Sequence, residues 1–355
     1  MNKIIIGLII FAGLCLMFKM TQASTPWYSS SYSARKPIVI TGTAVATQTN
    51  YPVKINVTYA SRMRADFGDV RFTGADGITP LNYWMETYTA STSAIFWVNI
   101  PNIPISPGTV TIYMYYGFPT TATTSNGTNT FDFFDDFTDG TIYSGYTQAG
   151  YNGWSEAGGV LTYTTAGTTA SDPNVLVINN KTYGYGYEIR GKVRVRQWQD
   201  HDYSRFGLGL ISNATGFGYK GLFHYTGSSK SRAVLHDTVA WLSQVNYVFS
   251  LNTWYQFAFF AKLVTTTRTL YEKDWPTGTA EPGAYSITTT SVNTTNQGNQ
   301  PVIAGSSIPG GGFTTQFIGD WDDVFVRKCE TAEPTVGALG AEEICTTGAF
   351  FAVFE

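Results

Sequence analysis

Apolar and polar residues alternate along short stretches of this chain, most clearly over residues 110–116. Every second position there is apolar or aromatic, and the positions between are threonine or tyrosine. This period of two is expected of a strand that buries one face of its sheet. Similar runs at residues 81–88 and 94–100 are separated by Thr/Ser-rich and Pro/Gly-rich segments of the kind that end strands. The three runs together predict a β-meander rather than helices.

The alternation stops over residues 118–130, where Thr, Ser, Asn and Gly dominate, which is typical of a linker. It resumes over residues 187–196, and further strand-like runs continue to residues 317–328. At 355 residues the chain is long enough for two cores. We therefore expect an all-β fold of two antiparallel, jelly-roll-like β-sandwiches in tandem. The predicted parts are a leader at 1–23, a first sandwich at 24–120, a linker at 121–130, a second sandwich at 131–328 and a C-terminal tail at 329–355.

The order of residues from 69 to 117 is distinctive. It contains D-V-R-F-T, D-G, P-L, Y-W and E, followed by A-x-x-W-V-x-I-P and then T-I-Y-M-Y-Y-G. This order resembles the domain of unknown function 2341 (DUF2341), over roughly residues 27–131. The matching positions are Asp69, Arg71, Phe72, Asp76, Gly77, Leu81, Trp84, Glu86, Trp97, Val98, Pro101, Tyr115, Tyr116 and Gly117. The resemblance implies a secreted or surface-exposed protein, often with a concanavalin A-like sandwich attached, and no assigned reaction.

The second half resembles a concanavalin A-like (laminin G-like) sandwich. Residues 134–141 read F-D-D-F-T-D-G-T and are followed by a tryptophan and G-G-V-L, while residues 317–328 resemble the closing strand. The resemblance implies that the first and last strands are neighbours, and that an acidic residue from each binds a structural calcium ion in many relatives. Oxygen ligands suit this cation, although aspartates in such segments also shape turns. The candidate ligands are Asp135, Asp136, Asp322 and Asp323.

Residues 1–23 have the features of a cleaved secretion signal: a basic start, an apolar run over residues 4–18 and small residues at the end. That run is shorter than the roughly 20 residues that span a bilayer, so we expect cleavage rather than an anchor, and no membrane span in the mature chain. Charged residues make up 13% and aromatic residues 15%, with a net charge of −3. This composition is typical of extracellular β proteins and offers no basic patch for nucleic acid. The expected location is secreted, extracellular or at the cell surface.

Two cysteines follow the leader, Cys329 and Cys345. An even pair in an exported protein predicts a disulfide, formed within the chain or between subunits. Asn-x-Thr sequons predict N-glycosylation in hosts that perform it. They begin at Asn56, Asn126, Asn180, Asn213 and Asn293.

Known catalytic motifs are missing from the sequence. Retaining glycosidases of the concanavalin A-like type carry E-x-D-x-x-E on one strand, because one carboxylate is the nucleophile and another the acid and base. No such string occurs. The sequence also lacks the G-x-S-x-G motif, which would supply a nucleophilic serine for a histidine base to activate. The sequence therefore predicts a protein without enzymatic activity.

Residues that suit a carbohydrate ligand gather in the segment W-Q-D-H-D-Y-S-R at 198–205. Aromatic rings stack on sugars, and carboxylates and other polar groups bond their hydroxyls. The predicted ligand-binding residues are Trp198, Asp200, His201, Tyr203, Arg205 and Trp241. The alternative is that the rings pack in the core, as aromatic residues of β-sandwiches commonly do.

These features predict a non-enzymatic exported surface protein that acts in adhesion or glycan binding through the second sandwich, with a glycan or another surface ligand as its partner. One alternative is a structural subunit that self-associates into an extracellular filament or envelope layer through edge strands or residues 350–354. Another is a glycoside-active enzyme, which the missing carboxylate motif disfavours. Calcium is the one cofactor that the sequence suggests.

Overall fold

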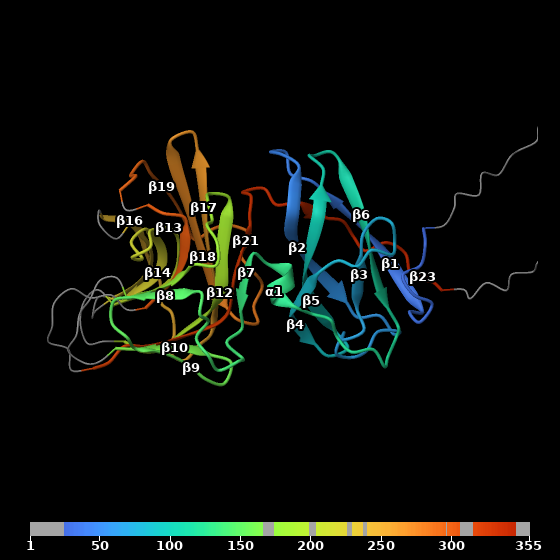
Figure 1. Cartoon of the computed structure of the whole chain (residues 1–355), viewed down its shortest axis with the longest axis horizontal. Helices are drawn as coiled ribbons and strands as arrows, with labels where there is room; N and C mark the ends of the chain where they lie inside the picture. Colours follow the sequence, from blue (N-terminus) through green and yellow to red (C-terminus); the bar gives the residue numbers. More distant parts are fainter. Residues whose placement is uncertain are drawn as a thin grey trace, which may run out of the picture.

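The computed structural model describes residues 25–165, 174–198, 204–225, 229–236, 240–295, 297–305 and 315–345. Its regular structure is almost entirely strand in antiparallel sheets, so the predicted all-β fold is confirmed. Figure 1 shows the strands in two groups that lie side by side, one coloured from blue to cyan and the other from green to orange. A helix long and apolar enough to cross a membrane does not occur in these ranges.

The first group is a sandwich of a five-stranded and a three-stranded sheet. The larger sheet contains β1 (Ala34–Thr41), β3 (Arg71–Thr73), β6 (Thr109–Tyr116), β22 (Thr335–Val336) and β23 (Glu343–Ile344). The smaller sheet contains β2 (Gln48–Thr58), β4 (Tyr83–Thr89) and β5 (Ser93–Ile103), with β5 in the centre. Alternate residues of both sheets meet in one core, among them Ile38, Ile55, Phe72, Phe96 and Met114.

The predicted β-meander is wrong in its third strand. β4 and β5 do pair as a hairpin, with Trp84 opposite Trp97. β6, however, pairs with β1 and β3 in the opposite sheet. β5 already has β2 and β4 on its two edges. The next strand therefore crosses to the other sheet, where its apolar face still reaches the same core.

The second group packs an eight-stranded sheet against a seven-stranded sheet. The eight strands are β7 (Phe133–Asp135), β9 (Trp154–Glu156), β10 (Leu161–Thr164), β12 (Tyr187–Gln197), β17 (Tyr255–Val264), β18 (Thr267–Pro276), β19 (Ile287–Ser291) and β21 (Ile318–Lys328). The seven are β8 (Tyr146–Ala149), β11 (Val175–Ile178), β13 (Ser204–Ser212), β14 (Tyr219–Tyr225), β15 (Lys230–His236), β16 (Ala240–Asn246) and β20 (Gln300–Ala304). Buried aromatic and β-branched side chains fill the space between the sheets.

Aromatic residues join the two sandwiches. Trp84 and Trp97 of the first pack against Phe131 and Phe325 of the second, and the two phenylalanine rings stack with centroids 4.2 Å apart. A short helix, α1 (Gly127–Thr130), lies at this contact, and the side chain of Asn126 caps it. The two sandwiches therefore pack directly against each other through side chains. The predicted domain boundaries stay a prediction.

The C-terminal residues return to the first sandwich. Residues 329–345, here called the C-terminal strap, contain β22 and β23, and both pair with β1. Val336 lies opposite Ile40, and Ile344 lies opposite Ala34. In Figure 1 this red segment leaves β21 and runs across to β23 beside β1. The last described residues therefore add two strands to the five-stranded sheet that contains β1.

Candidate functional site

The structure separates the predicted ligand-binding residues. Trp198 is 8% exposed and stacks on Tyr225 in the core of the second sandwich, so its role as a sugar platform was a wrong prediction. Core packing, the alternative, explains this ring, because it packs against the rings of Tyr225, Phe249 and Phe317. Asp200, His201 and Tyr203 lie outside the described residues.

Arg205 and Trp241 do come together, on the outer face of the seven-stranded sheet. The Arg205 guanidinium lies 4.9 Å from the Trp241 ring centroid. The structure adds His224, which is opposite Arg205 in the strand register and whose ring is 4.4 Å from that of Trp241. Burial and the charge of Arg205 lower the pKa of His224 to about 4, so this imidazole is neutral at physiological pH. Ligand binding on this face stays a prediction.

Two of the four predicted calcium ligands, Asp322 and Asp323, lie on β21, and the other two, Asp135 and Asp136, lie at the end of β7. β7 and β21 are neighbours, with Asp135 opposite Val324. The ammonium of Lys192, however, contacts Asp323 and lies 3.1 Å from Asp322, so two of the four carboxylates share one positive charge. Within the described ranges, no three His, Cys, Asp or Glu side chains are grouped so that they could hold a metal ion.

The calcium hypothesis stays a prediction that melting can test. A bound ion stabilises the folded state by mass action, so calcium would raise and a chelator would lower the melting temperature. The replacement Asp323→Asn would remove that response. Melting curves that calcium and chelator leave unchanged would contradict the hypothesis.

Cys329 and Cys345 do not bond to each other in this chain, and a disulfide between subunits stays a prediction. Cys329 is buried at the end of β21, where its Sγ lies 3.2 Å from Glu333 Oε1. The amide of Cys345 donates to the Ser33 carbonyl, beyond the opposite end of β1. The strap holds the cysteines apart because β22 and β23 pair with opposite ends of β1.

The sequons lie on exposed or half-buried loops and strands. Asn126, Asn213 and Asn293 accept backbone hydrogen bonds with their side-chain oxygens. Asn56 is exposed on β2 beside the groove described next. Glycosylation at the five positions stays a prediction.

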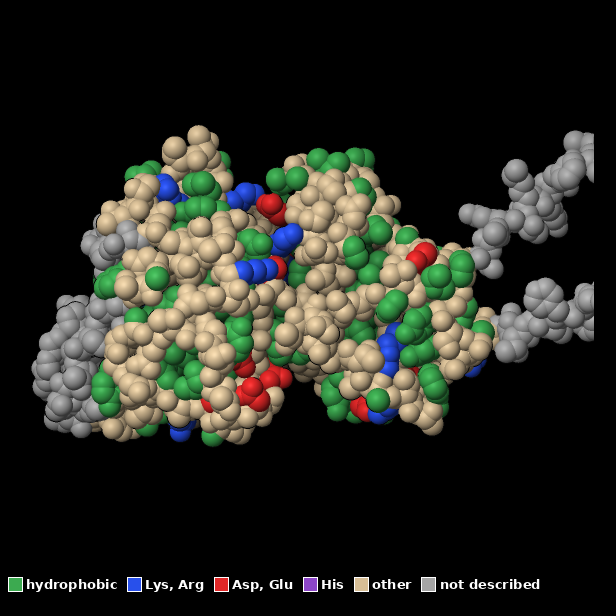
Figure 2. Space-filling view, viewed as in Figure 1, with side chains coloured by type: hydrophobic (Ala, Val, Ile, Leu, Met, Phe, Trp, Pro, Cys, Tyr) green, Lys and Arg blue, Asp and Glu red, His purple; other side chains and the backbone are tan. Residues whose placement is uncertain are grey.

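A groove of about 640 Å³ lies between the two sandwiches. Its walls come from β2, β4 and β5 on one side, and from β12, β17, β18 and residues 277–281 on the other. Figure 2 shows charged side chains of both signs gathered along this seam. Ligand sites often occur where two structural units meet, because two surfaces can enclose a ligand that one cannot.

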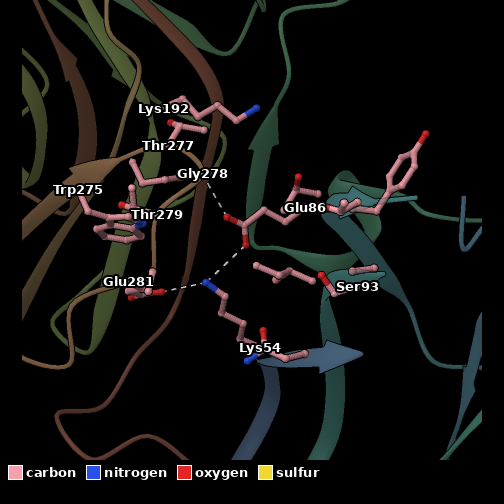
Figure 3. A pocket seen from close by; sticks show the side chains of 17 residues that line it. Lys54, Glu86, Ser93, Lys192, Trp275, Thr277, Gly278, Thr279 and Glu281 are labelled. Carbon is pink, nitrogen blue, oxygen red and sulfur yellow. Dashed lines mark hydrogen bonds and ion pairs between the residues drawn. The ribbon is translucent and has the colours of Figure 1, made fainter. Parts of the chain in front are cut away.

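Lys54, Glu86 and Glu281 form the centre of the groove (Figure 3). The Lys54 ammonium, on β2, lies 3.8 Å from Glu86 Oε2 and 2.9 Å from Glu281 Oε2. Glu86 belongs to β4, whereas Glu281 belongs to the segment after β18. The two carboxylates therefore come from different sandwiches and lie close to each other, because both contact one ammonium.

Two hydrogen bonds orient Glu86. Trp97 Nε1 donates to its Oε2 at 2.8 Å, and Gln256 of the second sandwich donates to its Oε1 at 3.3 Å. Trp97 is opposite Trp84 in the hairpin and is 2% exposed, which fixes its indole. A β-bulge after Met85 changes the register of β4 beside this residue.

Three cations surround Glu281. Besides Lys54, its Oε1 lies 2.8 Å from Arg190 and 2.6 Å from Lys273. Burial alone would raise the pKa of Glu281, but the charges of Arg190, Lys54 and Lys273 outweigh it and hold the pKa well below its usual range. Glu281 is therefore ionised at every pH near neutrality.

A tight turn brings Glu281 to the groove. Gly278 has φ +88°, a conformation that side-chain-bearing residues rarely adopt. The Thr279 amide and hydroxyl both bond to the Pro276 carbonyl, the hydroxyl at 2.7 Å. Sequence reasoning missed this site. A Pro-Thr-Gly-Thr run is typical of a turn, and nothing in the sequence indicated that the first sandwich would face it.

One protein family matches part of this sequence, and several solved structures are similar to part of this fold. A domain of unknown function, DUF2341, matches residues 66–156, which confirms this resemblance, although the match begins after residue 27 and ends beyond residue 131. No curated protein matches the chain. Among solved structures, a GH43 protein of Bacillus licheniformis is 14% identical with a TM-score of 0.41, and the match covers 70% of this chain and 46% of that one. This chain thus spans less than half the length of that protein.

Two further structures are similar over most of their own length. An endo-acting O-glycanase of the human gut microbiota is 10% identical with a TM-score of 0.40, covering 56% of this chain and 100% of that one. A β-1,3-glucanase of Mycobacterium marinum is 12% identical with a TM-score of 0.37, covering 55% and 98%.

These findings correct the prediction of a non-enzymatic adhesion or filament protein, because the similar structures are named as glycoside hydrolases, glycanases and glucanases. The sequence prediction relied on the lack of one local motif. Two carboxylates can also meet from distant parts of a chain, as Glu86 and Glu281 do. The low identities and TM-scores assign no reaction, so the proposal below depends on the groove.

Proposed function

We propose that this chain is a glycan-active protein that holds a saccharide in the groove and cleaves it between Glu86 and Glu281. One observation carries this proposal: carboxylates from the two sandwiches converge on the Lys54 ammonium, at 3.8 and 2.9 Å. Glycoside hydrolysis requires two carboxyl groups on either side of the scissile bond, roughly 5–9.5 Å apart depending on the mechanism.

The surroundings of the two groups suggest different roles. Glu281 keeps its negative charge and would stabilise the oxocarbenium-like transition state or activate water. Glu86 would donate a proton to the glycosidic oxygen, held in place by Trp97 and Gln256. Lys54 has its longer contact with Glu86, so that contact is the weaker one and would yield when a saccharide enters.

The replacement Glu86→Gln tests the acid role. A general acid typically contributes a factor of about 100 or more, so the variant should release reducing ends from a susceptible polysaccharide at least about 100-fold more slowly. Xylan, a β-1,3-glucan and mucin O-glycans are suitable substrates. Melting temperature should stay close to that of the wild type, since the amide preserves the shape of the side chain.

Glu342→Gln is the matched control, because Glu342 lies on the C-terminal strap and pairs with the half-exposed Arg62 outside the groove. Wild-type cleavage that survives in Glu86→Gln would contradict the acid role. A wild-type chain that cleaves none of the substrates would contradict the proposed function.

We also propose that the second sandwich is concanavalin A-like and that the chain is exported. The first is supported by the two packed antiparallel sheets and by the pairing of β7 with β21. Export is supported by the composition of residues 1–23.

A further inference from the structure

We infer that Arg190 is a positioning residue of the groove, which holds Glu281 in place and couples its orientation to that of Glu86. This inference rests on the function proposed above, because it names the residue that controls the two carboxylates of the same groove. It depends on the contacts of one buried guanidinium group with both sandwiches.

Arg190 packs against an indole of each sandwich. Its side chain, on β12, is 5% exposed, and its guanidinium lies 5.3 Å from the ring centroid of Trp97 and 5.3 Å from that of Trp275. Trp97 belongs to β5 of the first sandwich and Trp275 to β18 of the second. In Figure 3 Trp275 and Glu281 lie on one side of the groove and Glu86 on the other. Both indoles are buried, and a planar guanidinium packs well on aromatic faces, so these contacts fix the position of the cation.

Arg190 is linked to both glutamates of the groove, to one directly and to the other through Trp97. Its guanidinium donates to Glu281 Oε1 at 2.8 Å. The Trp97 indole beside the same guanidinium donates to Glu86 Oε2 at 2.8 Å. A further carboxylate, Glu188, lies farther from Arg190, at 3.7 Å. Loss of the guanidinium would therefore release Glu281 directly and remove a packing partner of the indole that orients Glu86.

The charged groups around Glu281 come from several strands. Lys54 of β2 and Lys273 of β18 lie 2.9 and 2.6 Å from it, besides Arg190 of β12. Lys54 is shared with Glu86 of β4, at 3.8 Å. The side chains of Lys54 and Lys273 are 23% and 13% exposed, so water screens the more buried arginine least. Burial raises the pKa of Glu281, and the charge of Arg190 is the largest of the effects that lower it.

The test follows the titration of Glu281 in the full chain by NMR. Glutamate labelled with 13C gives carboxyl signals, and the signal that Glu281→Gln lacks belongs to Glu281. We expect the wild-type side chain to stay ionised down to about pH 4. Arg190→Met should raise the titration midpoint by about one unit or more, because a neighbouring opposite charge lowers the pKa of a carboxyl group by roughly that much. Arg190→Lys should leave the midpoint close to that of the wild type, because its ammonium replaces the charge.

Cleavage kinetics give a second readout. On a substrate that the wild type cleaves, the acidic limb of kcat/KM should move to higher pH in Arg190→Met, together with the NMR midpoint. At pH 7 kcat should fall at least about tenfold and KM change less than about twofold, because misplacement of Glu281 affects the transition state rather than ground-state binding. Arg190→Lys should recover part of kcat, since it restores the charge but not the planar contact with the indoles. Where Arg190→Met does not fold, Arg190→Gln is the second variant, and the same shifts are expected of it.

Arg194→Met is the matched control. Arg194 lies on the same face of β12 as Arg190, and its guanidinium is 4.4 Å from the ring centroid of Trp254 and 2.6 Å from Asp320. It therefore makes the same kinds of contact, with an indole and a carboxylate, but with residues other than the two glutamates. We expect Arg194→Met to leave the Glu281 midpoint and the kinetics unchanged.

The two readouts separate the inference from the proposed function. A Glu281 midpoint that Arg190→Met leaves unchanged, or that Arg194→Met raises as much, would overturn the inference, and cleavage that depends on Glu86 would then leave the proposed function standing. A midpoint raised by Arg190→Met alone, in a chain whose wild type cleaves none of the substrates, would support the role of Arg190 and contradict the hydrolytic function.

Discussion

Replacing Glu188 by alanine is expected to lower the free energy of unfolding by about 3 kcal/mol. The Glu188 side chain is 1% exposed, accepts a hydrogen bond from Arg327 Nε at 2.8 Å and lies 3.7 Å from Arg190. Both guanidinium groups are buried, so the loss leaves two like charges in a medium of low dielectric constant. This loss is at the low end of the range for breaking a buried ion pair, because Arg327 keeps its contact with Glu333 and Arg190 keeps its contact with Glu281.

Urea titration of the wild type and Glu188→Ala measures this loss. Arg62→Ala is the matched control, because Arg62 and its partner Glu342 are 47% and 32% exposed, and such pairs contribute about 1 kcal/mol or less. Equal effects of the two replacements would show that burial does not decide the contribution of these ion pairs.

Glu272→Gln is expected to stabilise the protein at pH 8 and to flatten its stability between pH 4.5 and 8. Glu272 is fully buried on β18. Burial, and then the charge of Asp274, raise its pKa well above the usual value, against the opposing effect of Arg232. Arg232 is engaged by Asp274 at 2.7 and 3.1 Å, and it lies 3.9 Å from Glu272. The folded protein therefore favours the protonated form of Glu272 more than the unfolded chain does.

The direction of the effect follows from this raised pKa. A carboxyl group whose pKa is higher in the folded than in the unfolded protein favours folding at low pH. That contribution is lost as the pH rises from the unfolded pKa, about 4.3, through the folded one. Each unit of difference corresponds to about 1.4 kcal/mol, and glutamine cannot ionise. Urea titrations of both proteins from pH 4.5 to 8 measure the effect. A wild-type stability that does not fall over this range would contradict it.

The groove depends on the contact between the sandwiches, so stability and the proposed function are linked. Trp97 packs in the aromatic contact and also donates to Glu86. Arg190 lies 5.3 Å from the Trp97 ring and pairs with Glu281. The residues that join the two sandwiches are therefore the same ones that hold the two carboxylates in place.

The sequence by itself determined the fold class and the region that matches DUF2341. Alternation with a period of two records which face of each strand is buried, and this pattern is local, as over residues 110–116. The motifs from Asp69 to Gly117 likewise lie in order along the chain, and the match at residues 66–156 covers all of that stretch. The sequence also brought together Arg205 and Trp241 as candidates, although they belong to different strands.

The tertiary structure decided which sheet each strand joins and which side chains meet. The alternation of β6 would suit either sheet of the first sandwich. β6 pairs with β1 in the larger sheet because β2 and β4 already occupy both edges of β5. Trp198 was a surface candidate because aromatic residues suit both a core and a sugar site, and its neighbours settled the matter. Glu86 and Glu281 lie far apart in the chain and belong to no motif. They meet at Lys54 because the two sandwiches dock through Trp97 and Phe325, a contact that no local pattern encodes.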